Sequence, residues 1–346
     1  MNYIGSKLSL LPFIDSVVES LDLCGDIIFC DIFAGTGTVS KYFKNKGYKI
    51  ISNDIQNYSY VTIKHLIGNN RELKFEKLSS NGISPFNYLN SIPGQEGFIY
   101  KNYSNGGTQQ SEYNRLYFTD ENSKKIDAIR IKVENWKDEE LINLSEYNFL
   151  IASLLESADK VANTASVYEA FLKKIKKTAQ KELELKPIET ITSNLVHEIY
   201  NEDANKLIRK IQGDILYLDP PYNTRKYNTN YHMLEIISLY DNPYIKGKTG
   251  VRIDESKKSL YCSKREAKGA FEDLIKNAKF KYILLSYNNE GIISIDDIEK
   301  IMSKYGKYQC FKTEYKRFKA DKDINRNHKE VAVYEYIHCL EKNNED

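Results

Sequence analysis

The sequence contains little cysteine and histidine and no long hydrophobic run. The five cysteines are odd in number, form no C-x-x-C pair and are scattered along the chain, at Cys24, Cys30, Cys262, Cys310 and Cys339. The five histidines do not stand at ligand spacing either. We therefore predict neither a disulfide framework nor a metal site, and we interpret the cysteines as reduced thiols.

No apolar run approaches the roughly 18 residues of a membrane-spanning helix, and the N-terminus lacks the apolar stretch of a signal peptide. We therefore expect a cytoplasmic protein that does not bind membranes. With 346 residues, of which 41% are hydrophobic, the chain is long enough for one large α/β domain and a second, smaller one.

The formal charge of +2 is nearly neutral, but the basic residues are unevenly distributed. Residues 171–186 hold six lysines against two glutamates, residues 241–268 hold eight basic against four acidic residues, and residues 311–329 hold seven against three. Each stretch thus has a net charge of +4. A solvated helix face or loop explains any one of them, whereas three together favour contacts with phosphate groups.

The first part of the chain has the pattern of an α/β unit. Residues 26–31 form a short apolar run that predicts a buried strand, and a glycine-containing turn follows it at 32–37. A helix is predicted at 38–46, and a second strand at 48–52 leads to Asp54. Strand, turn, helix and strand in this order predict a doubly wound parallel sheet.

The sheet is expected to resume at Gly213. Apolar runs predict strands at 213–218 and 281–285, and two β-rich runs at 308–315 and 330–338 predict a closing antiparallel pair. Ser294 and Asp297 form a capping pair for a helix that ends near Gly306.

The long stretch between Asp54 and Gly213 is rich in Asn, Ser, Tyr and Lys and has little strand signal, so we predict a separate, largely helical insert. Thr119 is placed to cap a helix with a buried apolar stripe. Further helices are predicted through 149–155 and at 167–175.

The stretch Asp219-Pro220-Pro221-Tyr222 directly follows a predicted strand, which places Asp219 at the carboxyl end of that strand. Two successive prolines fix the backbone, so the Asp219 carboxylate and the Pro220 carbonyl point one way as two acceptors. Such acceptors suit an exocyclic amino group, while the Tyr222 ring lies against the flat base that carries it. Holding both N–H groups favours attack of the nitrogen on an electrophilic methyl group. An ordinary strand followed by a Pro-Pro-Tyr turn is the competing interpretation.

A nucleoside site is predicted at the glycine-containing turn, which has the spacing Asp31-x-Phe33-x-Gly35-x-Gly37. This spacing lets the backbone approach a nucleoside closely, and Asp54 stands where an acid would hold the ribose hydroxyls. NAD and S-adenosylmethionine both carry an adenosine, so this half of the sequence does not choose between them. Ser40 stands where a nicotinamide site would favour Gly or Ala, which weakens that alternative.

In this order, the motifs resemble the adenine-N6 DNA methyltransferases of the Dam-like class, and among them the modification enzymes of restriction systems such as the FokI-type methylases. The matching stretches are 2–7, 31–37, 52–54 and 219–225 continuing to 230–232. In that class the cofactor motifs come first, a target-recognition region is inserted, and the catalytic turn follows. The same order is found here, so the resemblance covers essentially the whole chain.

The resemblance implies an α/β fold, with a doubly wound S-adenosylmethionine-dependent methyltransferase sheet formed by residues 1–55 and 206–346. Residues 56–205 would be an inserted, mainly helical target-recognition domain. The implied activity is transfer of a methyl group from S-adenosylmethionine to N6 of an adenine flipped out of a specific site in double-stranded DNA. The implied partners are this DNA and a companion restriction endonuclease, and we expect a monomer that needs no metal.

The resemblance also implies the site residues. Tyr3 and Lys7 would close over the cofactor, and Asp219 would lie between the cofactor and the target base. The cofactor-binding residues are then Tyr3, Lys7, Asp31, Phe33, Gly35, Gly37, Asp54 and Asp219, and the catalytic residues are Asp219, Pro220, Pro221 and Tyr222. His232 and Asn230 are left without a role, and residues 286–289 are interpreted either as a contact to cofactor or DNA or as an ordinary polar strand end.

Three alternatives stay open. The same turn acts on other planar amino groups, such as N4 of cytosine or groups in RNA or protein, although an aspartate in its first position favours adenine in DNA. A DNA-binding subunit without turnover is disfavoured by the intact Asp54 and Asp219. A dehydrogenase is the most distant alternative.

Overall fold

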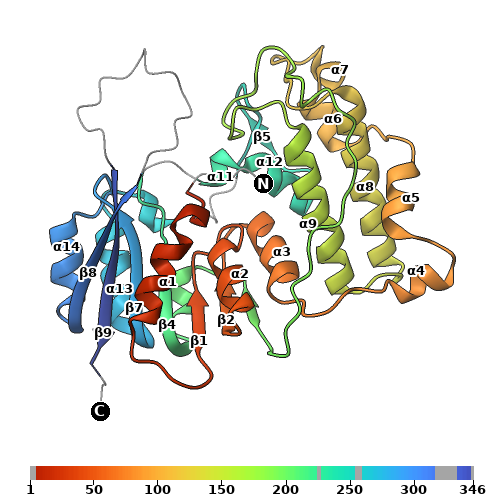
Figure 1. Ribbon diagram of the computed structural model, residues 1–346. Helices are drawn as coiled ribbons and strands as arrows, with labels where there is room; N and C mark the ends of the chain where they lie inside the picture. The colour runs from red at the N-terminus through yellow and green to blue at the C-terminus, as the bar shows by residue number, and fades with distance from the viewer. Residues whose placement is uncertain (1–4, 224–226, 254–258, 316–332, 344–346) are drawn as a thin grey trace.

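The computed structural model describes residues 5–223, 227–253, 259–315 and 333–343. A seven-stranded sheet lies between helices on its two faces, and a helical unit stands beside it (Figure 1). Across the sheet the strands are β3 (Glu198–Tyr200), β2 (Lys49–Asn53), β1 (Ile28–Asp31), β4 (Gln212–Leu218), β7 (Lys279–Asn288), β9 (Val333–Lys342) and β8 (Gly306–Tyr315).

Strands β3, β2, β1, β4 and β7 run parallel, and β9 is antiparallel to both β7 and β8. The five parallel strands therefore end at the same edge of the sheet. The predicted α/β sheet and its closing antiparallel pair are confirmed.

Each face of the sheet has its own core, because buried side chains alternate along the central strands. Phe29 and Tyr217 belong to the core that is covered by η1 (Leu8–Leu10), α1 (Leu11–Glu19), α2 (Thr38–Asn45) and α3 (Asn57–Leu66). Cys30 and Leu216 point to the opposite face, which is covered by α10 (Ala204–Leu207), α13 (Ala267–Asn277) and α14 (Ile295–Met302).

A third core holds the helical unit together. Its helices between α3 and β3 are α4 (Glu76–Ser80), α5 (Pro85–Ser91), α6 (Phe98–Tyr103), α7 (Asn105–Thr108), α8 (Asp120–Asp138) and α9 (Leu144–Val161). Two further helices share this core, α3 before it in the chain and α12 (His232–Leu239) long after it. The chain between β4 and β7 also forms α11 (Tyr227–Asn230), the short strands β5 (Ile245–Lys246) and β6 (Val251–Arg252), and η2 (Leu260–Cys262).

Two predicted helix caps are confirmed. The Thr119 side chain accepts a hydrogen bond from the Asn122 N–H at the start of α8, and Ser294 accepts one from the Asp297 N–H at the start of α14. Helix α14 ends at Met302, earlier than predicted, and β8 begins at Gly306.

The helix predicted at 167–175 is wrong. The chain there folds around the buried Asn163, whose side-chain carbonyl accepts the Lys176 N–H and whose backbone carbonyl accepts the Leu172 N–H. The Tyr168 N–H donates to the Asn230 carbonyl. Because these groups bond to distant partners, the residues have no helical hydrogen-bond ladder.

The sheet resumes earlier than Gly213, at β3, whose three residues pair in parallel with β2. A strand of three residues is too short to show a hydrophobic period, and it was therefore not predicted. The division into residues 1–55 and 206–346 with an insert at 56–205 remains a prediction, and it places β3 within the insert.

None of the helices in the described ranges is long and apolar enough to cross a lipid bilayer. The same ranges contain no group of three or more His, Cys, Asp and Glu side chains that would hold a metal ion. Tyr3 and residues 316–329, between the two runs of the predicted closing pair, lie outside the described residues.

Candidate active site

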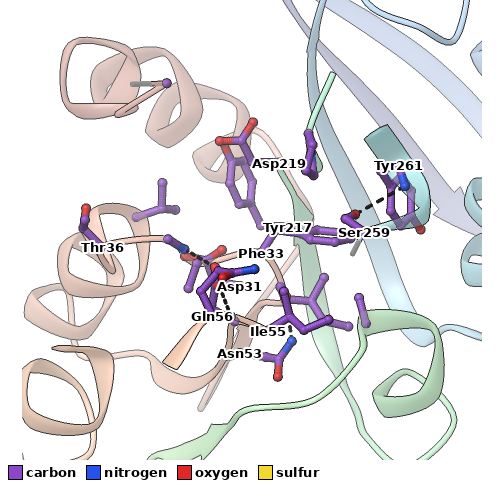
Figure 2. Close-up of a pocket in the computed structure, with 18 of the residues that line it drawn as sticks. Asp31, Phe33, Thr36, Asn53, Ile55, Gln56, Tyr217, Asp219, Ser259 and Tyr261 are labelled. Carbon is purple, nitrogen blue, oxygen red and sulfur yellow. Dashed lines mark hydrogen bonds between the residues drawn. The ribbon is translucent and has the colours of Figure 1, made fainter. Parts of the chain in front are cut away.

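A pocket lies at the edge of the sheet where β1, β2 and β4 end (Figure 2). Ligand sites of open α/β sheets occur at this edge, where the loops after parallel strands diverge. Three further segments complete the walls: Gly5 to Lys7, Glu202 to Ala204, and the residues Ser259, Tyr261 and Cys262.

Asp31 is fixed at the end of β1 by the first turn of α2. One carboxylate oxygen, Oδ2, accepts hydrogen bonds from the Ser40 hydroxyl over 2.8 Å and from the Ser40 N–H over 3.2 Å. The other oxygen, Oδ1, is buried and has no hydrogen-bond partner among the described residues. Burial, aided by Asp219 and Asp54 and opposed by Ser40, raises the pKa of Asp31 to about 7. The pocket wall thus contains a carboxylate oxygen that accepts no hydrogen bond from the described residues.

Asp54 is held by the glycine-containing turn. Its Oδ2 accepts the Gly35 N–H over 2.9 Å, and its Oδ1 accepts the Gln56 N–H over 2.8 Å. Because a carboxylate has about four lone-pair positions, it is able to accept further donors from a ligand.

Gly37 lies beside the pocket and is not among its lining residues. It has a φ of 78° and precedes α2, and a Cβ atom there would meet Cγ2 of Ile63 at 2.9 Å. Glycine therefore suits both the left-handed turn and the close approach of this turn to α3.

An aromatic wall lies across the pocket. The rings of Phe33 and Tyr261 meet edge to face, with centroids 5.1 Å apart. The Tyr261 hydroxyl is anchored by donating to Asn205 Oδ1 over 3.1 Å. The two side chains form a preformed apolar surface on which a flat ring system of a ligand can pack.

Lys7 and Asp219 form an ion pair at the pocket, with 3.1 Å between Nζ and Oδ1. The Lys7 side chain is 6% exposed and that of Asp219 is 18% exposed. Burial raises the pKa of the Asp219 carboxyl, although Lys7 opposes the shift. Burial lowers the pKa of Lys7, but Asp219, Glu335 and Tyr222 outweigh burial, and the pKa lies above the usual value for lysine.

Tyr222 follows on the same turn. The Lys7 ammonium lies 5.7 Å from the centre of its ring, and the ring of Tyr287 meets it edge to face at 6.3 Å. Its backbone carbonyl accepts the Ile292 N–H over 3.0 Å, which ties the turn to the segment after β7. Of the four residues of the turn, Asp219 and Pro221 line the pocket.

The structure brings most of the predicted residues together. The predicted residues that line the pocket are Lys7, Asp31, Phe33, Gly35, Asp54, Asp219 and Pro221. Pro220 and Tyr222 adjoin Asp219 and Pro221 in the chain, and Gly37 stands between the lining residues Thr36 and Thr38. His232 and Asn230, left without a role, are both buried; the His232 ring bonds through Nε2 to the Tyr168 carbonyl over 3.0 Å, and burial lowers its pKa to about 4.

Sequence reasoning missed several lining residues. Asn53 cross-links two of the walls, because its amide donates to the carbonyls of Ile32 and Glu202 and accepts the Glu202 N–H. Other missed residues are Tyr217, Gln56, Glu202, Asp203, Ser259 and Tyr261. Tyr217 alternates with Leu216 on a strand that reads as uniformly apolar, and the segments 202–204 and 259–262 follow elements too short to predict.

The charges of the lining fit a cationic ligand. Lys7 is the single ammonium group among the described lining residues, whereas the carboxylates are Asp31, Asp54, Glu202, Asp203 and Asp219. S-adenosylmethionine carries a sulfonium, an ammonium and a carboxylate group, and its adenosine has the flat ring and ribose hydroxyls that the aromatic wall and Asp54 suit. The fold and the site together define a methyltransferase that acts on a planar amino group.

Comparison with known proteins specifies this class. Residues 3–301 match the D12 class N6 adenine-specific DNA methyltransferases, and the chain belongs to this family. The methyl donor of these enzymes is S-adenosylmethionine, and they methylate adenine in DNA.

The relatives agree with this assignment. The chain is 49% identical over 345 residues to the type II methyltransferase M.NlaIII of Neisseria lactamica, covering 99% of both chains. It is 38% identical over 342 residues to the type II methyltransferase M.CviAII of Paramecium bursaria Chlorella virus 1, covering 97% of this chain and 98% of that one. It is 41% identical over 351 residues to the type II methyltransferase M.FokI of Planomicrobium okeanokoites, covering 99% of this chain but 53% of that longer protein.

Proposed function

We propose that this chain is the modification enzyme of a type II restriction–modification system, which methylates N6 of an adenine flipped out of a specific DNA sequence. The observation that carries this proposal is the position of Asp219, which lines the pocket and at the same time begins the Asp-Pro-Pro-Tyr turn. The names of two full-length relatives, both type II methyltransferases, support the biological role.

In this proposal, S-adenosylmethionine supplies an electrophilic methyl group. Asp54 accepts the ribose hydroxyls, the open oxygen of Asp31 accepts a cofactor N–H, and Phe33 and Tyr261 pack on the adenine ring of the cofactor. Lys7 covers the pocket beside Asp219. All five side chains line the pocket in positions fixed by their own contacts.

The target adenine enters from the DNA side of the catalytic turn. Inside a duplex its amino group is inaccessible, so the base must leave the helix, at roughly a few kcal/mol of unstacking. The Asp219 carboxylate and the Pro220 carbonyl accept the two N–H groups, and Tyr222 stacks on the base. As the nitrogen takes up the methyl group it becomes positively charged, and Asp219, whose pKa burial raises, accepts the proton that the nitrogen loses.

We assign sequence recognition to the helical unit between β2 and β3. The sheet has the same chemical task at every DNA site, whereas the reading of base edges differs between enzymes. The basic stretches at 171–186 and 241–268 are assigned to phosphate contacts, because phosphate contacts position a protein without reading sequence.

The decisive experiment is nucleoside analysis of DNA after incubation with the purified protein and S-adenosylmethionine, followed by modification-sensitive sequencing. We expect N6-methyladenine within one short sequence. N4-methylcytosine, or methylation of RNA or protein in place of DNA, would contradict the proposal. Methylation of adenines irrespective of sequence would contradict the role in a restriction–modification system.

A further inference from the structure

A second acid lies beside the Lys7–Asp219 pair, on the strand that closes the sheet. Glu335 pairs with Asn288, the last residue of β7, and so stands at the edge where the parallel strands end. It also lies beyond residues 3–301, the part of the chain that matches the family.

The alternation of side chains places Glu335 and Asp219 on the same face of the sheet. Ile337 on β9 and Tyr217 on β4 both belong to the core under α1 and α2. Glu335 precedes Ile337 by two residues and Asp219 follows Tyr217 by two, so both acids project from this face. Glu335 is 9% exposed and is therefore a largely buried carboxylate.

The charges of both acids act on the Lys7 ammonium group. Burial lowers the pKa of the Lys7 ammonium group, and Asp219 and then Glu335 raise it. Burial raises the pKa of Glu335, which Lys7 lowers and Asp219 raises. The three groups therefore act on one another within one buried cluster.

We infer that Glu335 is a positioning residue of the methyl transfer, which shares the Lys7 ammonium group with Asp219 and leaves the cluster with a net negative charge. This inference rests on the proposed function. Glu335 touches neither cofactor nor base in this account; it acts through Lys7 and Asp219.

The need for a second acid follows from the charge of the reaction. An ion pair formed by Lys7 and Asp219 alone has no net charge. As the amino nitrogen forms its bond to the methyl carbon, the carbon–sulfur bond breaks with its electron pair left on sulfur. The nitrogen then carries the positive charge until one of its protons passes to Asp219 and on to water. A fixed negative charge in a buried site stabilises that nitrogen far more than the same charge would in water.

Among the residues that the structure describes, few other titratable groups face Glu335. The titratable groups that face Glu335 are Lys7 from the N-terminal segment, Tyr217 on β4, and Asp219 and Tyr222 on the catalytic turn. Its strand neighbours Asn288 on β7 and Thr313 on β8 are uncharged.

The test compares Glu335→Gln and Glu335→Asp with the control Glu341→Gln. Glu341 lies on the same strand and, six residues on, projects from the same face, where it contacts the Tyr282 hydroxyl at 3.5 Å. Two quantities are measured: the single-turnover rate as a function of pH, and the titration of Asp219 in the protein alone. The second uses ¹³C-labelled aspartate, with the Asp219 signal assigned by its loss in Asp219→Asn.

Removing the negative charge of Glu335 makes Asp219 easier to ionise, so in Glu335→Gln the Asp219 titration and the acid limb of the rate profile should move to lower pH. We expect a shift of about one pH unit and a rate roughly tenfold lower at the plateau, with S-adenosylmethionine affinity nearly unchanged. Glu335→Asp should lie between wild type and Glu335→Gln, and Glu341→Gln should match wild type.

An unmoved Asp219 titration in folded Glu335→Gln would overturn the inference, even if the rate fell, because a merely structural role predicts that result. Thermal unfolding checks the fold first. If Glu335→Gln does not fold, Glu335→Asp provides the test. The inference would then be overturned if the Asp219 titration and the single-turnover rate of Glu335→Asp equal those of the wild type. If the wild-type protein does not methylate adenine, the proposed function fails, while the Asp219 titration still reports on Glu335.

Discussion

The N–H of Gly35 donates to Oδ2 of Asp54 over 2.9 Å, and this contact joins the turn after β1 to the end of β2. The carboxylate that is proposed to hold the cofactor ribose therefore also shapes the turn on which the cofactor would lie. Loss of Asp54 removes both effects at once.

We predict that Asp54→Ala raises the KM for S-adenosylmethionine more than it lowers kcat. Removing a charge-assisted hydrogen-bond acceptor costs about 1.5 to 3 kcal/mol, or roughly 10- to 100-fold in affinity. Isothermal titration with the cofactor checks this. Asp54→Asn keeps one acceptor oxygen and should show a smaller loss; unchanged affinity in a folded Asp54→Ala would show that Asp54 does not bind the cofactor.

We predict that Asp219→Ala lowers the single-turnover rate by roughly two to three orders of magnitude, the effect of removing a positioned polar group that acts in the transition state. DNA binding should persist, because the assigned phosphate contacts lie elsewhere. Asp214→Asn is the control, since Asp214 lies near the other end of β4 and accepts the Ile28 N–H over 2.8 Å. It should lower stability without a comparable loss of rate, and a near wild-type rate in Asp219→Ala would contradict the proposed chemistry.

The raised pKa of Asp31 predicts how stability depends on pH. The folded-state pKa is about 7, above the unfolded value near 3.9, so the folded protein binds the extra proton between these values. The contribution of the Asp31 carboxyl group to the free energy of unfolding is fully present below the unfolded-state pKa, and it is lost as the pH rises toward 7. Relative to Asp31→Asn, the wild-type protein without cofactor should lose about 2 kcal/mol of unfolding free energy between pH 5 and pH 7. Urea unfolding of both proteins at the two pH values measures this difference, and parallel pH dependences would contradict the assignment.

We predict that Lys173→Ala combined with Lys174→Ala weakens binding to specific and unrelated DNA alike. Both lysines are exposed. The slope of log affinity against log salt should become shallower by roughly one per lost phosphate contact. Lys276→Ala with Lys279→Ala is the matched control, because these exposed lysines lie by the start of β7, at the opposite edge of the sheet from the pocket. A loss confined to the specific sequence would assign the first pair to base reading.

The sequence predicted the site where strong local signals exist. The strands that lead to Asp31 and Asp219 are apolar runs bounded by turn residues. In both turns the residues proposed to bind ligand lie close together in the sequence. Tyr261 and Glu335 could not be found in this way. Tyr261 lines the pocket because its segment folds back onto Phe33. Glu335 influences the charge of Lys7 because the register of an antiparallel strand, more than 300 residues away in the chain, places it at the same edge of the sheet. The wrong helix at 167–175 has a similar cause, since distant asparagines replace its local hydrogen bonds.

We predict that exchanging residues 60–205 with those of a relative of different specificity moves the methylated sequence with the exchanged segment. The expected readout is modification-sensitive sequencing of DNA from cells that express the chimera. An active chimera that still modifies the original sequence would place recognition in the region after Tyr222.

The packing of α12 sets a condition on any such exchange. This helix follows the catalytic turn, yet its side chains Met233, Leu234, Ile236 and Ile237 are buried in the core of the helical unit. The helical unit is thus discontinuous in the chain. An exchange of residues 60–205 alone transfers most of the unit without α12, the helix that completes its core. Recombination between relatives should yield working hybrids chiefly when α12 is compatible or travels too. New specificities would then arise more readily by point changes on the outer surface of the unit than by wholesale replacement of it.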